Sequence, residues 1–275
     1  GFREFRAERG TFMLNDVPMH LFATSSWPNS VQMGWPGRIR DRWQETRTLF
    51  ESVKQSGHDI FRAHTEPWSS LLTDLCDEIG LLFVAEGIMS SIPGKYNWDR
   101  PETMDHFKRF CALWPQREMN NPSLVIRSIE NEIGYLLQEK IMLKESIPRV
   151  HEGYIECGRI VKQADRSRLI MYEGSGPAFY DAADICNNHY PGDEYRWSYY
   201  PNASYWPGRR MDVYFTKSWQ WDREKPLYMG EWGWFPGGRD QFAAYIGPTV
   251  YRPGMNYGGA KAVLWAMGIE GMRYY

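Results

Sequence analysis

Short apolar runs that alternate with amphipathic stretches recur along the chain, and this pattern constrains the fold most strongly. Eight runs have the length and composition of buried strands: Met19–Phe22, Asp59–Arg62, Leu81–Ala85, Leu124–Ile129, Leu169–Met171, Ile185–His189, Leu227–Gly230 and Ala262–Trp265. Helix-like stretches lie between them: Trp43–Gln55, Leu71–Ile79, Met104–Trp114 and Tyr154–Ala164. Such alternation is typical of βα units around a parallel sheet. The first run is followed by no glycine-rich dinucleotide fingerprint, so the pattern favours an α/β fold of the closed (β/α)8 (TIM) barrel type.

The length of the chain suits one domain of this kind. A (β/α)8 barrel typically needs about 250 residues, and the chain has 275. We therefore interpret residues 1–275 as a single barrel domain. About ten residues follow the eighth run, too few for a full closing helix, so we expect an incomplete final helix and a chain that is a fragment of a longer multidomain protein.

Composition excludes several classes of partner. The 32 basic and 34 acidic residues nearly balance, giving a net charge of −2, and no basic stripe indicates nucleic-acid binding. No apolar run reaches the roughly 18–20 residues of a membrane span, and no signal peptide is recognised. The compartment is left open between secreted, periplasmic and cytoplasmic. Four cysteines show no CxxC or Cys/His ligand spacing and decide neither the redox compartment nor metal binding. We predict no metal site.

Aromatic residues are unusually frequent, at 16% of the chain with 13 Trp and 17 Tyr. Tryptophan is costly to bury because its N–H needs a partner. The surplus is consistent either with rings that line a sugar-binding groove or with a large aromatic core. The segment 195–221 concentrates several of these rings, and we interpret it as an aromatic wall beside a substrate or a partner surface.

Two glutamates follow predicted strands directly. Leu124–Ile129 leads into Glu130, Asn131 and Glu132, and Leu227–Gly230 leads into Glu231. Catalytic residues of (β/α)8 barrels lie at the C-terminal ends of the strands. Hydrolysis of a glycosidic bond needs two carboxylates, one acid and one nucleophile. A single strand-end glutamate is more often a solvated loop residue, but two of them together indicate this chemistry. We therefore predict Glu132 as the acid/base and Glu231 as the nucleophile.

The acid/base glutamate needs a pKa raised toward neutrality. A strand end that faces a substrate-filled cleft supplies the partial desolvation for this. The preceding Asn131 can donate an amide hydrogen bond to a sugar hydroxyl beside the reacting carbon. This chemistry requires no cofactor, and we predict none.

The motifs around these glutamates resemble glycoside hydrolases of clan A. Ser128-Ile129-Glu130-Asn131-Glu132 resembles the Ser-x-x-Asn-Glu end of strand four, and Gly230-Glu231-Trp232-Gly233 resembles the nucleophile end of strand seven. Other stretches resemble family 2, the group of β-galactosidases, β-mannosidases and β-glucuronidases. These are Phe12–Pro18 at the start of the barrel, Phe61–Pro67 with a shortened Arg-x-x-His motif, and Leu75–Glu86 around the third strand. Arg127 and Glu130 depart from the family, where Trp and Gly are usual.

The resemblance implies a retaining β-glycoside hydrolase, with β-sandwich domains flanking the barrel or contacts within an oligomer. It also implies roles for further residues. Arg62 would hydrogen-bond Glu231, with a surface ion pair as the alternative. His64 would line the sugar pocket or lie satisfied in the core, and Glu86 would bind sugar hydroxyls or pair with a nearby arginine.

The remaining substrate-binding candidates lie after the sixth, seventh and eighth runs. Tyr190 or His189 would place a polar group beside the nucleophile, and the sequence does not choose between them. Trp232 directly follows the nucleophile. Trp265 resembles the platform under the bound sugar, with a core tryptophan as the alternative. The predicted partner is a carbohydrate, either an oligosaccharide or a polysaccharide.

The sugar is constrained by one further observation. β-Glucuronidases of the resembled family grip the substrate carboxylate with an Asn-x-Lys motif, and this sequence contains no Asn-x-Lys. The prediction is therefore a neutral-sugar β-glycoside. Three alternatives stay open: an endo-acting polysaccharide hydrolase of the same clan, a barrel that binds carbohydrate without catalysis, and an interaction domain whose Trp/Tyr segment packs on a sister domain or subunit.

Overall fold

The computed structural model describes residues 3–26, 43–64, 67–89, 96–136, 142–189 and 223–231. The chain starts with a small antiparallel sheet, whose strands are β1 (Phe5–Glu8), β2 (Thr11–Leu14) and β3 (Val17–Met19). Its first turn, Arg9-Gly10, has positive φ at both residues, the geometry that matches the twist of a two-residue hairpin. Gly10 N–H donates to Glu224 O, which joins this sheet to the segment before the last described strand.

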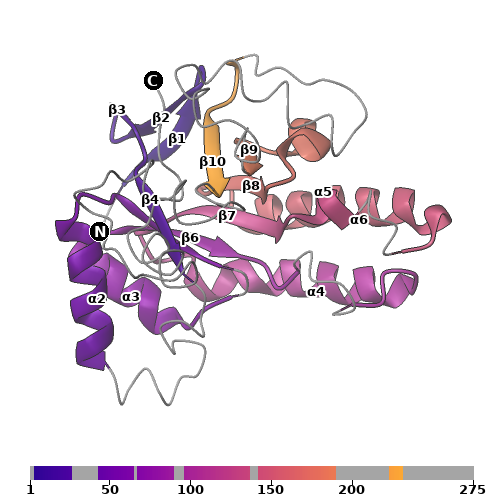
Figure 1. Cartoon of the computed structure of the whole chain (residues 1–275), viewed down its shortest axis with the longest axis horizontal. Coiled ribbons are helices and arrows are strands. Elements are labelled where there is room, and N and C mark those ends of the chain that lie inside the picture. Colours follow the sequence, from indigo (N-terminus) through magenta and orange to yellow (C-terminus); the bar gives the residue numbers. More distant parts are fainter. Residues whose placement is uncertain are drawn as a thin grey trace, which may run out of the picture.

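A parallel sheet follows, and its strands pair in chain order (Figure 1). Its members are β4 (Ala23–Ser26), β5 (Ile60–Ala63), β6 (Leu82–Glu86), β7 (Leu124–Asn131) and β8 (Leu169–Glu173). Two more strands, β9 (Cys186–His189) and β10 (Leu227–Glu231), pair parallel to each other. Asp184 N–H donates to Ile170 O at 2.9 Å, which places the start of β9 beside β8. The seven strands thus follow one another as in a (β/α)8 barrel.

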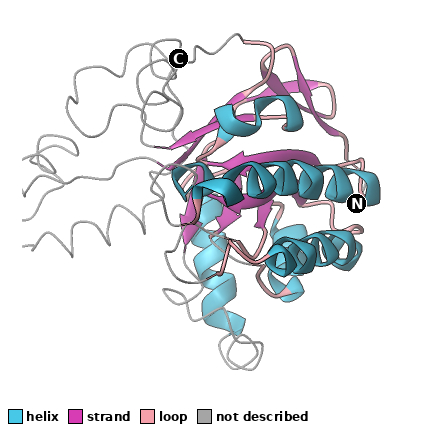
Figure 2. Ribbon diagram, turned by 90° about the vertical axis from the view of Figure 1, so that its right-hand side faces the viewer, coloured by secondary structure: helices cyan, strands magenta, loops and turns pink. Residues whose placement is uncertain are grey.

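Helices connect the strands and lie outside them (Figure 2). They are α2 (Trp43–Gln55), α3 (Ser70–Ile79), α4 (Pro101–Glu118), α5 (Ile133–Leu136) and α6 (Ile147–Ala164), with 3₁₀ turns η1 (Lys144–Ser146) and η2 (Gly176–Ala182). α4 and α6 lie side by side along the sheet (Figure 1). Both ends of α3 are capped. At its start, Ser69 accepts a hydrogen bond from Leu71 N–H, and after its last residue Gly80 has the left-handed conformation at φ +70°.

Two hydrophobic cores lie on the two faces of the parallel sheet. Phe61 and Phe83 belong to the core between sheet and helices, whereas Ile60 and Val84 belong to the core inside the barrel. This division follows from the period of two along a strand. Burial of one such phenylalanine stabilises the fold by about 2–3 kcal/mol. The inner core also includes Phe5 and Phe12, whose stacked rings attach the antiparallel sheet to the barrel.

The structure confirms most predicted elements and corrects one. The helix Trp43–Gln55 has the predicted bounds, and the strands predicted second to seventh agree to within a few residues at each end. The first strand, predicted at Met19–Phe22, is wrong: Met19 ends the antiparallel sheet and the parallel strand is Ala23–Ser26. Both segments are short and mixed in polarity, so hydrogen bonding to a neighbouring strand decides which of them joins the parallel sheet: Ala23–Ser26 pairs with β5, and Met19 pairs with Phe12 of β2. The eighth predicted strand, Ala262–Trp265, lies outside the described residues.

The helix predicted at Met104–Trp114 continues through Pro115 to Glu118. Proline removes one backbone donor from a helix interior. Pro115 lies in the last turn of α4, where carbonyls have no intrahelical donor, and its carbonyl accepts a hydrogen bond from Arg127 Nη2 at 3.1 Å. Within the described residues no helix combines the length and the apolar character needed to span a membrane.

Candidate functional site at the C-terminal strand ends

Arg62, on β5, lies at the centre of the C-terminal strand ends and is 1% exposed. Its Nη2 donates to Asn131 Oδ1 at 2.7 Å, and its Nη1 donates to Gly230 O at 3.3 Å. Asn131 directly precedes Glu132, and Gly230 directly precedes Glu231. One guanidinium therefore joins the ends of β7 and β10, which carry the two predicted catalytic glutamates.

The second function of Arg62 is to neutralise buried carboxylates. Its Nε donates to Glu86 Oε1 at 2.5 Å and lies 3.6 Å from Glu173 Oε1. Both carboxylates are fully buried, so the guanidinium offsets a large desolvation cost. Of the two alternatives for Glu86, the structure supports pairing with an arginine. The ion pair of Arg62 with Glu86 is buried, so Arg62 does not form the surface ion pair that was its alternative role. Its predicted hydrogen bond to Glu231 stays a prediction, because the Glu231 side chain lies outside the described residues.

His64 extends the same network and is buried at 3% exposure. Its Nδ1 lies 2.8 Å from Arg62 Nη2 and 3.4 Å from Glu86 Oε2. Because arginine only donates, the short contact requires Nδ1 to accept, which leaves the proton on Nε2. His64 is therefore a buried residue with polar partners, as one alternative predicted, and it belongs to the polar cluster at the candidate site. Its contact with a sugar stays a prediction.

A bulge in β7 places Asn131 in this cluster. The register against β8 pairs Ser128 with Met171 and then Asn131 with Glu173, so β7 has one residue more than its partner. A one-residue shift moves side chains to the other face of a sheet. The bulge is therefore the reason that Asn131, and not Glu130, reaches Arg62.

Glu132 has a backbone conformation that is uncommon for glutamate. Its φ is +58°, in the left-handed region, which costs a non-glycine residue about 1–3 kcal/mol. Its N–H donates to Glu173 O at 2.7 Å, a bond that holds this conformation. The residue is partly exposed, in contrast to the buried Arg62 and Glu86, as expected for a group that meets a substrate.

Glu173 is a site residue that the sequence analysis missed. It ends β8, is fully buried, and contacts Arg62 by its side chain and Glu132 by its backbone. The predicted strand stopped at Met171, two residues short. The signal was available, because Glu173 is another carboxylate at the end of an apolar run, like Glu86 and Glu132.

The two residues that depart from the family point away from the barrel interior. Arg127 is fully buried behind the sheet, over the ring of Trp114 at 5.1 Å and within 3.7 Å of Glu118 and Asp165 oxygens. Burial lowers the pKa of Arg127 to about 10, against the raising effect of the two carboxylates. Glu130 accepts a hydrogen bond from Ile133 N–H at 2.6 Å. Neither residue is therefore placed to select a sugar directly.

Other predicted site residues lie wholly or partly outside the described residues. The backbone of His189 pairs with that of Glu231 in the β9–β10 ladder, which supports their proximity without locating their side chains. Tyr190, Trp232, Trp265 and the aromatic segment 195–221 are not described. Among the residues that the structure does describe, no group of three or more His, Cys, Asp or Glu side chains is arranged to hold a metal ion.

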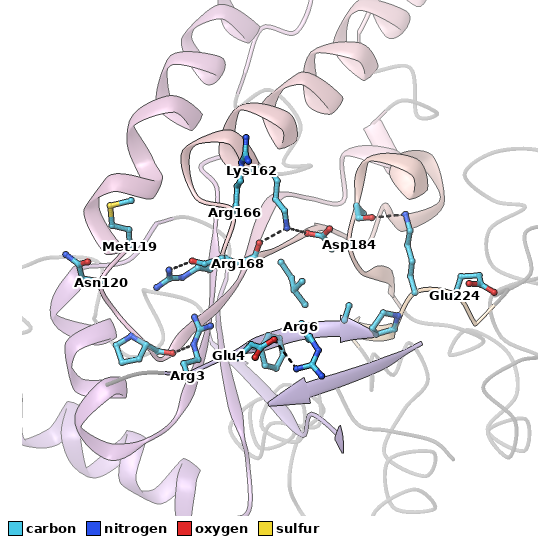
Figure 3. Close-up of a pocket in the computed structure, with 18 of the residues that line it drawn as sticks. Arg3, Glu4, Arg6, Met119, Asn120, Lys162, Arg166, Arg168, Asp184 and Glu224 are labelled. Atoms are coloured by element: carbon cyan, nitrogen blue, oxygen red, sulfur yellow. Dashed lines mark hydrogen bonds and ion pairs between the residues drawn. The ribbon is translucent and has the colours of Figure 1, made fainter. Parts of the chain in front are cut away.

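A cavity of about 900 Å³ lies at the opposite, N-terminal end of the strands (Figure 3). Its wall is strongly charged, and two of its cations pair with carboxylates of the same wall: Lys162 donates to Asp184 Oδ2 at 2.6 Å, and Arg6 to Glu4 Oε1 at 3.1 Å. Residues at this end of a (β/α)8 barrel serve stability, whereas catalysis occurs at the C-terminal end. The cluster around Arg62 is therefore the better candidate site.

Known structures share this fold. A glycosyl hydrolase family 2 member from Bacteroides cellulosilyticus is 21% identical with a TM-score of 0.54, over 69% of this chain and 24% of that one. The Ruminococcus gnavus β-glucuronidase is 22% identical with a TM-score of 0.54, over 70% and 33%. The β-glucuronidase 3 of Bacteroides uniformis is 20% identical with a TM-score of 0.56, over 68% and 23%. The chain thus spans about a quarter to a third of the length of these proteins.

The family assignment rests on a broader match. The family described as "Glycosyl hydrolases family 2, TIM barrel domain" matches residues 37–238, which is more than half of the chain and includes Arg62, Glu132 and Glu231. The strand order and the polar cluster at the C-terminal strand ends agree with this match. The chain belongs to glycosyl hydrolase family 2, and its fold is the TIM barrel domain of that family.

Proposed function

We propose that the protein hydrolyses a β-glycoside with retention of configuration, using Glu231 as nucleophile and Glu132 as acid/base. The observation that carries this proposal is the position of Arg62, which donates to the residue before each glutamate. Two carboxylates at the C-terminal strand ends of one barrel are what this reaction needs. Retention requires carboxyl groups about 5–5.5 Å apart, and inversion about 6.5–9.5 Å.

The reaction would proceed in two displacements. A carboxylate oxygen of Glu231 attacks the anomeric carbon, the glycosidic C–O bond breaks, and the proton of Glu132 goes to the departing oxygen. Water then attacks the glycosyl-enzyme, Glu132 takes a proton from that water, and the bond to Glu231 breaks. Both glutamates return to their starting protonation states. The part exposure of Glu132 is consistent with this exchange of protons with substrate and water.

The charge of the site supports a neutral sugar. At the described C-terminal strand ends, Arg62 is the one permanent cation, and it already contacts Glu86 and Glu173. A carboxylate on the substrate would meet further negative charge from the ionised nucleophile Glu231, whereas Glu132 is protonated when it acts as the acid. Two like unit charges about 4 Å apart repel by about 1 kcal/mol in water and by more near a protein surface. This argument and the lack of Asn-x-Lys in the chain favour a neutral sugar, whereas several proteins of similar fold are β-glucuronidases.

A panel of 4-nitrophenyl β-glycosides tests the proposal. The panel contains the galactoside, mannoside, glucoside and glucuronide, and it is run on wild type, Glu231→Gln and Glu132→Gln. We expect turnover of a neutral glycoside by wild type and near-background rates for Glu231→Gln. Glu102→Gln, at an exposed position on α4, is the matched control and should keep the wild-type rate.

Three outcomes would count against the proposal. Near-normal activity of Glu231→Gln would exclude its role as nucleophile. Faster hydrolysis of the glucuronide than of any neutral glycoside would overturn the choice of sugar. The first-formed anomer, followed by NMR, should be β; an α product would show inversion.

A further inference from the structure

The segment that carries Glu132 is held in place by side chains that directly contact its backbone. Glu130 Oε2 accepts a hydrogen bond from Ile133 N–H at 2.6 Å. Ser175 Oγ accepts one from Gly134 N–H at 2.8 Å. Together with the bond from Glu132 N–H to Glu173 O, three consecutive backbone donors, at residues 132, 133 and 134, therefore have partners fixed by buried groups.

The two side chains also contact each other. Ser175 Oγ lies 3.3 Å from Glu130 Oε2 and can donate to it. Glu130 is fully buried and Ser175 is 1% exposed. A hydrogen bond between two buried groups is electrostatically stronger than one in water, because the local dielectric constant is lower. The two side chains thus form one rigid unit behind the segment.

The partners of this unit are themselves anchored. Ser175 follows Gly174, whose φ is +71° and whose N–H donates to Asn187 Oδ1 on β9 at 2.6 Å. Ser128 Oγ donates to the carbonyl of Glu130 at 2.9 Å. Strands β7, β8 and β9 therefore all contribute to the position of the segment, and none of these contacts uses the side chain of Glu132.

We propose that Glu130 and Ser175 are positioning residues that fix the acid/base carboxyl of Glu132. The proposal rests on the proposed function, since it presupposes that Glu132 is the proton donor. The left-handed backbone at Glu132, φ +58°, is strained, and without external support the residue relaxes toward ordinary φ values. Relaxation would turn its carboxyl away from the leaving oxygen. A misplacement of about 1 Å at a reacting group can cost about 100-fold in rate.

Loss of positioning has a signature that loss of stability lacks. Protonation of the leaving oxygen matters most when the leaving group is basic, and little when it departs as a stable anion. A displaced acid therefore slows hydrolysis of a phenyl glycoside and spares a 2,4-dinitrophenyl glycoside. A smaller fraction of folded enzyme slows both equally.

The experiment compares kcat/KM on these two glycosides of the sugar that wild type prefers, for wild type and Ser175→Ala. We expect Ser175→Ala to lose about tenfold or more on the phenyl glycoside and less than about threefold on the 2,4-dinitrophenyl glycoside. Ser123→Ala is the matched control: Ser123 is equally a buried serine, but its Oγ donates to Thr73 O at the far end of β7. Its ratio should equal that of wild type.

The isosteric Glu130→Gln variant gives a second measurement. It keeps an acceptor for Ile133 N–H but replaces one carboxyl oxygen by an amide nitrogen, so we expect a change of the same sign and smaller size. If Ser175→Ala does not fold by circular dichroism, Glu130→Gln alone decides. An unchanged ratio in the folded variants overturns this proposal and leaves the proposed function intact. Wild type without activity on any glycoside refutes the proposed function itself.

Discussion

Arg62 Nη2 donates to Asn131 Oδ1 at 2.7 Å, with both groups buried. This one contact connects β5 to β7 across residues that are 69 positions apart. Because the same guanidinium reaches the backbone of β10 at Gly230, the geometry of the site depends on Arg62 more than on any other described cation.

Replacement of Arg62 should separate stability from activity. Arg62→Met leaves Glu86 and Glu173 without their shared cation, so we expect the free energy of unfolding to fall by about 3–5 kcal/mol. Arg62→Lys keeps the charge but loses the planar fork that contacts several partners. It should retain more stability than Arg62→Met while its kcat/KM falls by about 100-fold. Urea unfolding and the glycoside assay measure the two quantities; equal stability of the two variants would contradict the ion-pair role.

Glycine at position 132 should stabilise the protein relative to alanine. Glycine adopts φ near +58° without strain, whereas alanine keeps the cost of the left-handed conformation. We expect Glu132→Gly to exceed Glu132→Ala by about 1 kcal/mol in the free energy of unfolding, with both variants inactive on poor leaving groups. The comparison is made by urea unfolding. A more stable alanine variant would show that residue 132 does not hold the positive φ.

Asp165 should make the stability of the fold depend on pH in the acidic range. Burial by itself raises the pKa of this carboxyl, but hydrogen bonds from Ser167 and the charges of Arg168 and Arg127 outweigh it, and the pKa lies below the ordinary 3.8. A lowered pKa stabilises the folded state above about pH 4, and this contribution is lost as pH falls through the folded-state pKa.

The variant Asp165→Asn tests this dependence. At pH 7 it should lower the free energy of unfolding by about 3 kcal/mol, because Arg127 loses a partner in a buried position. The difference in free energy of unfolding between this variant and wild type should narrow as pH falls below about 4. Asp181→Asn, at an exposed position, serves as control and should differ little from wild type at any pH. A gap that widens on acidification would reverse the assigned sign.

Two glycines of α6 should respond differently to alanine. A Cβ at Gly158 would collide with the hydroxyl of Tyr172, which itself donates to Tyr154 O at 3.0 Å. A Cβ at Gly153 would meet the flexible end of Met104 at 2.8 Å. We expect Gly158→Ala to destabilise by about 1–3 kcal/mol and Gly153→Ala to be near neutral, since alanine favours the helix. Thermal unfolding that ranks them in the opposite order would contradict the packing between α6 and β8.

Local pattern determined the greater part of the fold. Apolar period and helix signals are properties of neighbouring residues, which is why Trp43–Gln55 has the predicted bounds and six of the seven described parallel strands were found. The exception, Met19–Phe22, lies where an antiparallel pairing competes with a parallel one. Such a competition is settled by long-range hydrogen bonds that no local window contains.

The candidate site was likewise determined partly by the sequence and partly by the tertiary structure. Sequence alone placed Glu132, Asn131, Arg62 and Glu86 at strand ends, because the ends of apolar runs can be read directly. Only the tertiary structure decided that Glu86 pairs with Arg62, that Glu173 belongs to the cluster, and that Glu130 turns toward Ser175. These outcomes depend on register: one extra residue in the β7 bulge exchanges the faces of Glu130 and Asn131. A bulge costs little in local energy and is set by the neighbouring strand, so the sequence around it carries no signal strong enough to predict it.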